Sequence, residues 1–193
     1  SNTQEPSQEQ LNSLVNLYTQ GRYQEAVTQA SELLKNFPND INLYNISGAA
    51  NQRLGNLEEA VQAYNKAISL KPDYTDAYYN LGNALKTQGK LEDAIKAYEK
   101  AISLKPDYAE AYNNMGTALH DQNKITEAVE AYSKATSIKP DYAEAYYNLG
   151  TALREKSKLN EAIEAYNEAI SINPEYAEAY FNLGNALKEQ GKL

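Results

Sequence analysis

The side chains that most often carry catalysis are scarce in this chain of 193 residues. The only histidine is His120, and the chain contains no cysteine. Metal sites and nucleophilic triads need several such residues together, and the chain has no His-His pair, Cys-His pair or HExxH motif from which to build one. We therefore expect no catalytic residue, no metal site and no cofactor.

The remaining candidates for chemistry are the carboxylates and the glycines. The chain has 26 Asp and Glu residues, but those that form pairs fall at helix positions that face solvent, where nothing would raise a carboxyl pKa for acid-base work. Each glycine is isolated, whereas a phosphate-binding loop gathers glycines between a strand and a helix. The sequence therefore predicts a protein that is not an enzyme.

The sequence does contain candidate binding residues, because asparagine recurs every 34 residues in part of the chain. A side-chain amide both donates and accepts hydrogen bonds, so a row of amides can pair with the backbone of an extended peptide whatever its side chains. The alternative is that asparagine merely occupies a polar helix face, although it is a mediocre helix former to recur so regularly. We call these residues the asparagine row, which comprises Asn80, Asn114, Asn148 and Asn182.

Further rows lie beside the asparagine row. The aromatic row either offers flat amphipathic surfaces of the kind enriched at binding hot spots or simply packs neighbouring repeats together. It comprises Tyr79, Asn113, Tyr147 and Phe181. The basic row comprises Lys86, His120 and Arg154, with Gln52 and Lys188 at its ends. An acidic row at Asp76, Glu110, Glu144 and Glu178 makes the surface that carries these rows mixed in sign.

The elements that must position these rows follow from an internal repeat. Prolines recur every 34 residues, at positions 38, 72, 106, 140 and 174, and such a period indicates a repeat architecture. Residues 71–104 read KPDYTDAYYNLGNALKTQGKLEDAIKAYEKAISL, and residues 139–172 repeat the pattern as KPDYAEAYYNLGTALREKSKLNEAIEAYNEAISI. Apolar residues at helical spacing predict a first helix over about 75–88 and a second over about 91–104, ending before a proline that cannot continue it.

Glycines mark two kinds of position in these units. Gly55 and Gly89 lie where the first helix must reverse into the second, a place where a left-handed residue costs least as glycine. Ser157 stands at the same place in a later unit and is expected to use another turn geometry or to carry strain. Gly82 lies inside the first helix, where glycine costs about 1 kcal/mol relative to alanine, so we expect a neighbouring helix to approach it closely.

These residues resemble the tetratricopeptide repeat family, whose unit is a helix-turn-helix of about 34 residues. One unit carries the family's aromatic, Leu-Gly, Ala and Pro positions as Tyr78, Leu81, Gly82, Ala94, Tyr98, Ala101 and Pro106. The resemblance implies an all-α fold, a right-handed α-solenoid of antiparallel helix pairs, with partners held in a concave groove lined by the first helices. The units most resemble arrays that precede O-GlcNAc-transferase-type glycosyltransferase or bacterial sulfotransferase-like domains, and such glycosyltransferase arrays use an asparagine ladder.

The repeat also predicts how the chain is organised. Residues 7–40 keep only part of the pattern and are expected to form a divergent amino-terminal cap. The expected segments are 1–6 as a disordered start or a remnant of cloning, 7–40 as the cap, 41–74, 75–108, 109–142 and 143–176 as repeats, and 177–193 as the first helix of an incomplete repeat. That last segment predicts either a fragment of a larger protein or a helix through which two copies associate as a homo-oligomer.

Composition limits the partners. A net charge of -8 at pH 7 points away from nucleic acid, because nucleic-acid binders gain affinity by neutralising phosphates. No stretch approaches about 18 consecutive apolar residues, so we expect no membrane partner and a soluble, cytoplasmic protein. The absence of cysteine leaves the redox compartment undetermined.

The function that the sequence predicts is a protein-protein interaction scaffold that binds extended peptide or protein partners in its groove. Two alternatives stay open. One is a module that assembles with copies of itself into dimers or filaments. The other is a module that presents substrates to a glycosyltransferase or sulfotransferase domain, which rests on the family resemblance alone.

Overall fold

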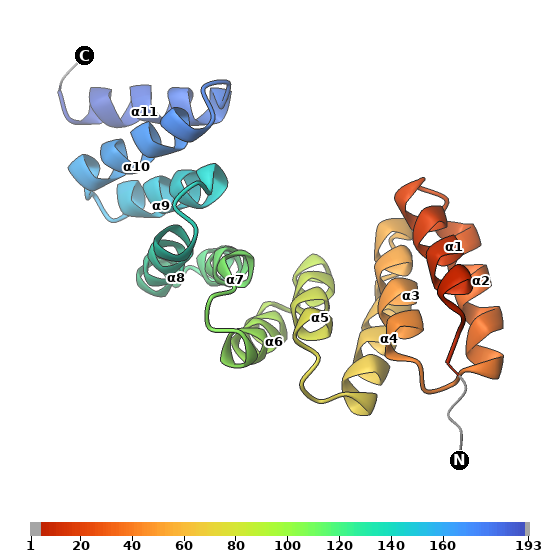
Figure 1. Ribbon diagram of the computed structural model, residues 1–193. Helices are drawn as coiled ribbons and strands as arrows, with labels where there is room; N and C mark the ends of the chain where they lie inside the picture. The colour runs from red at the N-terminus through yellow and green to blue at the C-terminus, as the bar shows by residue number, and fades with distance from the viewer. Residues whose placement is uncertain (1–4, 192–193) are drawn as a thin grey trace. The chain divides into compact units, whose positions relative to one another are not determined.

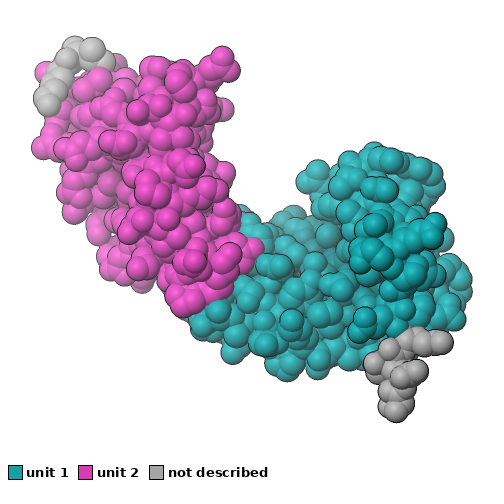
Figure 2. Space-filling model, viewed as in Figure 1, with its two compact units in different colours: residues 1–104 teal, residues 105–193 magenta. Residues whose placement is uncertain are grey.

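The computed structural model describes residues 5–191, so the ends of the expected segments 1–6 and 177–193 lie outside the described residues. The described part consists of eleven α-helices, and it contains no β-strand (Figure 1). None of these helices is long and apolar enough to cross a membrane. The chain divides into two compact units, Ser1–Leu104 and Lys105–Leu193 (Figure 2).

The helices are short and of similar length in both units. Unit 1 contains α1 Gln8–Thr19, α2 Tyr23–Asn36, α3 Ile41–Leu54, α4 Leu57–Leu70, α5 Thr75–Thr87 and α6 Leu91–Leu104. Unit 2 contains α7 Ala109–Asp121, α8 Ile125–Ile138, α9 Ala143–Glu155, α10 Leu159–Ile172 and α11 Ala177–Glu189. In the terms used above, odd-numbered helices are first helices and even-numbered helices are second helices.

Successive helices pack as pairs. In unit 1, α3 packs against α4 and α5 against α6, and in unit 2, α7 packs against α8 and α9 against α10. A connection of only a few residues joins the members of each pair, so the two helices run antiparallel. The predicted all-α class of stacked antiparallel helix pairs is therefore confirmed in each unit. The limits of the repeats at 41, 75, 109 and 143 stay a prediction.

The amino-terminal helices share a core of their own. α1 begins with a capping box, in which Gln10 N donates to Ser7 Oγ at 3.2 Å and Ser7 N donates to Gln10 Oε1 at 2.9 Å. These two hydrogen bonds satisfy backbone donors that the first turn of a helix leaves open. Fully buried Leu14 and Leu43 then pack α1 and α3 against α2.

The turn between first and second helix has one geometry throughout. Gly55 and Gly89 adopt left-handed φ values of 82° and 74°, as the sequence predicts. Ser157 also adopts a left-handed φ, of 58°, so the expectation of another turn geometry is wrong. The alternative expectation, that this turn is strained, agrees with a left-handed serine. The hydrogen bond from Lys158 N to Leu153 O, at 3.0 Å, closes this turn and holds the unfavourable conformation.

The core of each complete pair is a tyrosine pressed onto a glycine. A Cβ atom added at Gly48, Gly82, Gly116 or Gly150 would lie 2.7, 2.6, 2.7 or 2.7 Å from the Cε1 atom of a tyrosine in the following helix. Those tyrosines are Tyr64, Tyr98, Tyr132 and Tyr166, none of which is more than 3% exposed. The close approach predicted for the helical glycine is therefore confirmed, and its cause is an aromatic ring that leaves no room for a methyl group.

Alkaline pH is expected to unfold the helix pairs through these buried phenols. Burial raises the pKa of Tyr132 to about 12, and it also raises the pKa of Tyr64, Tyr98 and Tyr166. A phenol whose pKa is higher in the folded chain stabilises the fold fully below its unfolded pKa of about 10. That contribution is lost as the pH rises through the folded value.

Phenolate absorbance and circular dichroism, recorded together across the alkaline range, test this expectation. A late phase of phenolate formation should coincide with loss of helicity. Tyr132→Phe, which removes one raised pKa, should move the loss of helicity to higher pH. Ionisation of all 17 tyrosines with helicity retained would contradict it.

Candidate functional site

The asparagine row lies at the edge of the surface that each first helix turns away from its core. In α9 the residues Ala145, Ala152 and Leu153 are buried against neighbouring helices. Asn148 is half-buried at the border of that stripe, and Asn80 has the same position in α5. Helical periodicity therefore places the amides where one side of each can meet a neighbouring helix and the other can meet a ligand.

In the asparagine row, Asn80, Asn148 and Asn182 are each tied to the preceding first helix. Asn80 Nδ2 donates to Asn45 Oδ1 at 3.1 Å, and Asn148 Nδ2 donates to Asn113 Oδ1 at 3.0 Å. Asn182 Nδ2 donates to the hydroxyl of Tyr147 at 3.0 Å. Each bond joins the asparagine row to the aromatic-row position 35 residues earlier. Asn45 also has this position, because it lies 34 residues before Tyr79, but it is not among the residues predicted from the sequence.

These bonds leave part of each amide available. A primary amide has two N–H donors and an acceptor oxygen. Within residues 5–191, no hydrogen bond reaches the Oδ1 atom of Asn80 or of Asn148. An amide held at one N–H, with its oxygen open, is oriented in advance to accept a hydrogen bond from a ligand.

Asn113 differs from the groove position that the sequence predicts, because its side chain is fully buried. Its Oδ1 accepts from Asn148, and its Nδ2 lies 3.4 Å from both Asn114 Oδ1 and Glu144 Oε1. Asparagine is shorter than the tyrosine that occupies the row in α5 and α9, so neighbouring side chains close over it. Asn113 therefore bridges first helices within unit 2 rather than lining a surface.

The remaining members of the aromatic row are accessible to different degrees. The ring of Tyr79 lies 6.2 Å from that of Tyr98, and the ring of Tyr147 lies 6.1 Å from that of Tyr166, which supports the packing interpretation for these two half-buried residues. Phe181 is 70% exposed. The row thus combines packing in α5 and α9 with an open aromatic surface on α11.

Some members of the charged rows contact neighbouring polar side chains. His120 Nε2 lies 3.0 Å from Glu155 Oε1, and Arg154 donates to Asn182 Oδ1 at 3.5 Å. Glu110 accepts a hydrogen bond from Lys139 Nζ at 2.9 Å, and this bond lowers the pKa of Glu110. Lys86 is half-buried at the corresponding position of α5. Because these rows carry both acidic and basic side chains, the surface favours no ligand of one strong sign.

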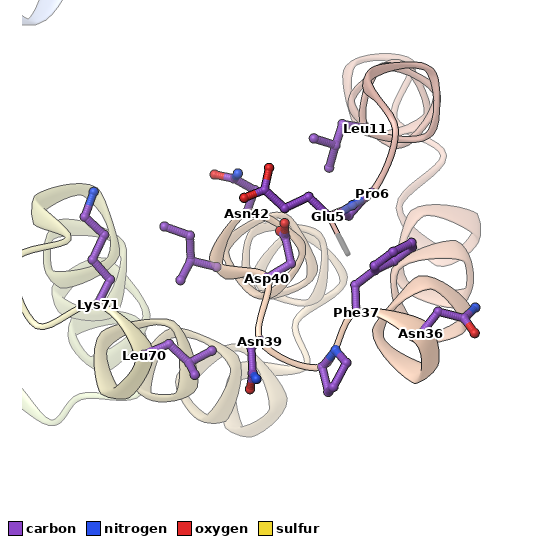
Figure 3. A pocket seen from close by; sticks show the side chains of 12 residues that line it. Glu5, Pro6, Leu11, Asn36, Phe37, Asn39, Asp40, Asn42, Leu70 and Lys71 are labelled. Atoms are coloured by element: carbon purple, nitrogen blue, oxygen red, sulfur yellow. The ribbon is translucent and has the colours of Figure 1, made fainter. Parts of the chain in front are cut away.

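Neither a metal centre nor a hollow in unit 1 changes this picture. In the described part of the chain, no three His, Asp or Glu side chains are placed to hold a metal ion. A hollow of about 680 Å³ lies in unit 1 beside Leu11, Phe37 and Asp40 (Figure 3). The Asp40 carboxylate beside it caps α3, accepting from Leu43 N at 2.9 Å, so this side chain has a structural role.

Comparison with known proteins identifies the family. The family model described as TPR repeat matches residues 53–89, 82–123, 116–154 and 150–191, which together make up most of the chain. The chain belongs to the tetratricopeptide repeat (TPR) family. No curated protein sequence matches it.

Solved structures share the fold. A crystal structure of MamA is 29% identical, covers 84% of this chain and 95% of its own, and has a TM-score of 0.77. YrrB, described as a TPR protein with an unusual peptide-binding site, is 22% identical, covers 91% of each chain and has a TM-score of 0.74. PilF of Pseudomonas aeruginosa is 16% identical, covers 95% of this chain and 84% of its own, and has a TM-score of 0.85.

Proposed function

We propose that the chain is a protein-interaction scaffold that binds extended peptide segments along its first helices. Membership of the TPR family supports the scaffold role. The observation that carries the peptide-binding role is the pair of anchored amides at Asn80 and Asn148, each held by the preceding helix with its oxygen open. A similar fold in YrrB, which has a peptide-binding site, agrees with this proposal.

Recognition of this kind depends on the peptide backbone more than on its side chains. An extended peptide presents N–H and C=O groups at regular spacing, and an asparagine amide can pair with either. Tyr147 lies beside the row in unit 2 and offers an aromatic edge for the peptide's side chains. Because the proposed contacts are made by uncharged amides, we expect binding to depend only weakly on salt.

Removing one anchored amide from each unit is expected to weaken peptide binding about tenfold or more. The double variant Asn80→Ala, Asn148→Ala removes both amides, and a net hydrogen bond contributes about 0.5–1.5 kcal/mol. A peptide array probed with the intact chain and with the variant measures the loss. The matched control is Asn167→Ala, which makes the same substitution at an exposed position of α10.

The comparison of these proteins shows whether peptides bind at the asparagine row or at another surface. Circular dichroism should give the same helicity for all three proteins. Binding that falls only in the double variant supports the proposal. Equal binding by the double variant and the intact chain would place peptide partners on another surface and end the proposal.

Two alternatives from the sequence remain predictions. The substrate-presenting role beside a glycosyltransferase or sulfotransferase domain gains no support from the three structures compared above. Self-association through residues 177–190 is favoured by the exposure of Phe181 and Tyr180 on α11. Light scattering over a range of concentrations tests it, and a constant monomer mass would exclude it.

A further inference from the structure

Three loops that join a second helix to the next first helix share a lysine-tyrosine contact. The loops after α4, α6 and α8 each read KPDY. In each loop the lysine ammonium lies over the ring of the tyrosine three residues later, at 5.7 Å from the ring centre of Tyr74, 4.7 Å from that of Tyr108 and 4.9 Å from that of Tyr142. The loop therefore makes a cation–π contact wherever it carries a lysine.

Lys139 shows how such a cation is held. Its Nζ atom lies 2.9 Å from Glu110 Oε1 and 4.9 Å from the ring centre of Tyr142. The carboxylate comes from the first turn of α7, and the ring comes from the loop before α9. A carboxylate and an aromatic ring placed in this way together hold one cationic side chain.

The loop after α10 has the same turn but lacks the cation. Asn173 takes the place of the lysine. Tyr176 N donates to Asn173 O at 3.1 Å, and the corresponding bond in the loop before α9 is 3.2 Å long. The side chain of Asn173 stays within the loop, where its Oδ1 accepts from Glu175 N at 3.2 Å. The backbone is therefore alike in the two loops, and only the charged side chain differs.

Glu144 and Tyr176 consequently have no cation between them. Glu144 has the position of Glu110 one repeat later, but it is exposed where Glu110 is half-buried. Within residues 5–191, Glu144 forms no ion pair, and no lysine or arginine lies over the Tyr176 ring. Burial raises the pKa of Tyr176 to about 12, and the Glu144 carboxylate contributes to this rise, so the two groups lie near each other.

The Glu144–Tyr176 pair adjoins the asparagine row. Glu144 lies one helical turn before Asn148, and both contact Asn113. The Oδ1 atom of Asn113 accepts from Asn148 Nδ2 at 3.0 Å, and its Nδ2 atom lies 3.4 Å from Glu144 Oε1. The ring of Tyr176 lies 5.1 Å from that of Tyr147. A peptide paired with the amide of Asn148 therefore has this pair within reach of a neighbouring side chain.

We propose that the Glu144–Tyr176 pair binds a lysine or arginine side chain of the peptide partner. The partner's cation takes the place that Lys139 occupies one repeat earlier. This inference rests on the proposed peptide-binding function and adds a chemical preference to it, namely a basic residue beside the segment that pairs with Asn148. Since the amide contacts carry no net charge, only this preference should weaken as the salt concentration rises.

A positional-scanning peptide library tests the preference. Each member is an extended peptide of mixed sequence in which one position is fixed as lysine, arginine, glutamine or glutamate. We expect the intact chain to prefer a basic residue over glutamine at one position by about three- to tenfold, the combined effect of an exposed ion pair and a cation–π contact. The preference should be smaller at high salt.

Variants of the chain locate the preference. Glu144→Gln removes the charge and should reduce the preference about two- to fivefold, which is the contribution of an exposed ion pair. Asn173→Lys supplies the chain's own cation and should abolish the preference. The matched control is Glu168→Gln, which makes the same charge change at an exposed position of α10 and should retain the preference. Circular dichroism should give the same helicity for all four proteins.

The results distinguish this inference from the proposed function. If no member of the library binds the intact chain, the peptide-binding proposal fails and this inference falls with it. If peptides bind without a preference for a basic residue, this inference alone is overturned. It is also overturned if the preference is the same in the intact chain, Glu144→Gln and Asn173→Lys, because the basic residue then binds elsewhere.

Discussion

Replacing Tyr166 with alanine is expected to destabilise unit 2 by about 3–5 kcal/mol, the range for removing a large aromatic side chain from a core. Tyr166 is fully buried, and its ring lies over Gly150 and 6.1 Å from the ring of Tyr147. It packs α9, α10 and α11 together through Leu153 and Ala186. The cavity left by alanine cannot be filled from the glycine side, because Gly150 has no side chain to move into it.

Urea unfolding followed by circular dichroism measures this loss. Tyr166→Phe keeps the ring and removes only the hydroxyl, which donates to Thr151 Oγ1 at 3.3 Å, so it should cost about 0.5–1.5 kcal/mol. Tyr180→Ala removes a tyrosine that is 50% exposed and should cost less than Tyr166→Ala. Similar losses for Tyr166→Ala and Tyr180→Ala would show that the tyrosine-glycine contact does not hold the pairs together.

The same glycine-to-alanine change is expected to have opposite effects at Gly150 and Gly184. A Cβ atom at Gly150 would lie 2.7 Å from Tyr166 Cε1, and overpacking of this kind costs about 1–3 kcal/mol. The gain of about 1 kcal/mol in helix propensity offsets only part of that cost. At Gly184 nothing lies within 4 Å, so alanine brings the propensity gain without the clash.

Thermal unfolding of the two variants and of the intact chain shows whether each substitution stabilises or destabilises the protein. Gly150→Ala should lower the midpoint temperature, and Gly184→Ala should leave it unchanged or raise it. Both positions lie inside a first helix and have the same local sequence pattern, so each variant is the control for the other. Destabilisation of similar size at both sites would mean that the helical glycine is required for a local reason and not for the tyrosine.

Much of the fold could be predicted from the residues alone. The first helix expected over about 75–88 is observed as Thr75–Thr87, and the second, over about 91–104, as Leu91–Leu104. Local signals decide these boundaries: apolar residues at helical spacing, a glycine at the turn and a proline beyond the second helix. Ser157 shows the limit of such reasoning, because its turn follows the tertiary arrangement against the preference of serine.

The candidate site was predictable only in outline. The 34-residue period places Asn114 and Asn148 on one row, because they have the same position in successive repeats. It does not predict that Asn113 is buried among Asn114, Asn148 and Glu144. The side chains of neighbouring helices decide whether Asn113 is buried, and the sizes of these side chains differ from one repeat to the next.

The sequence by itself therefore determined the helices, their turns, the repeat and the rows of side chains that the repeat aligns. Only the tertiary structure decided which members of a row are covered, tied to a neighbour or left open. Gly82 and Gly184 lie in identical heptapeptides, yet one is sealed by Tyr98 and the other faces open space. The physical reason is that helix formation depends on residues within a few positions, whereas burial depends on a second helix that packs against the first.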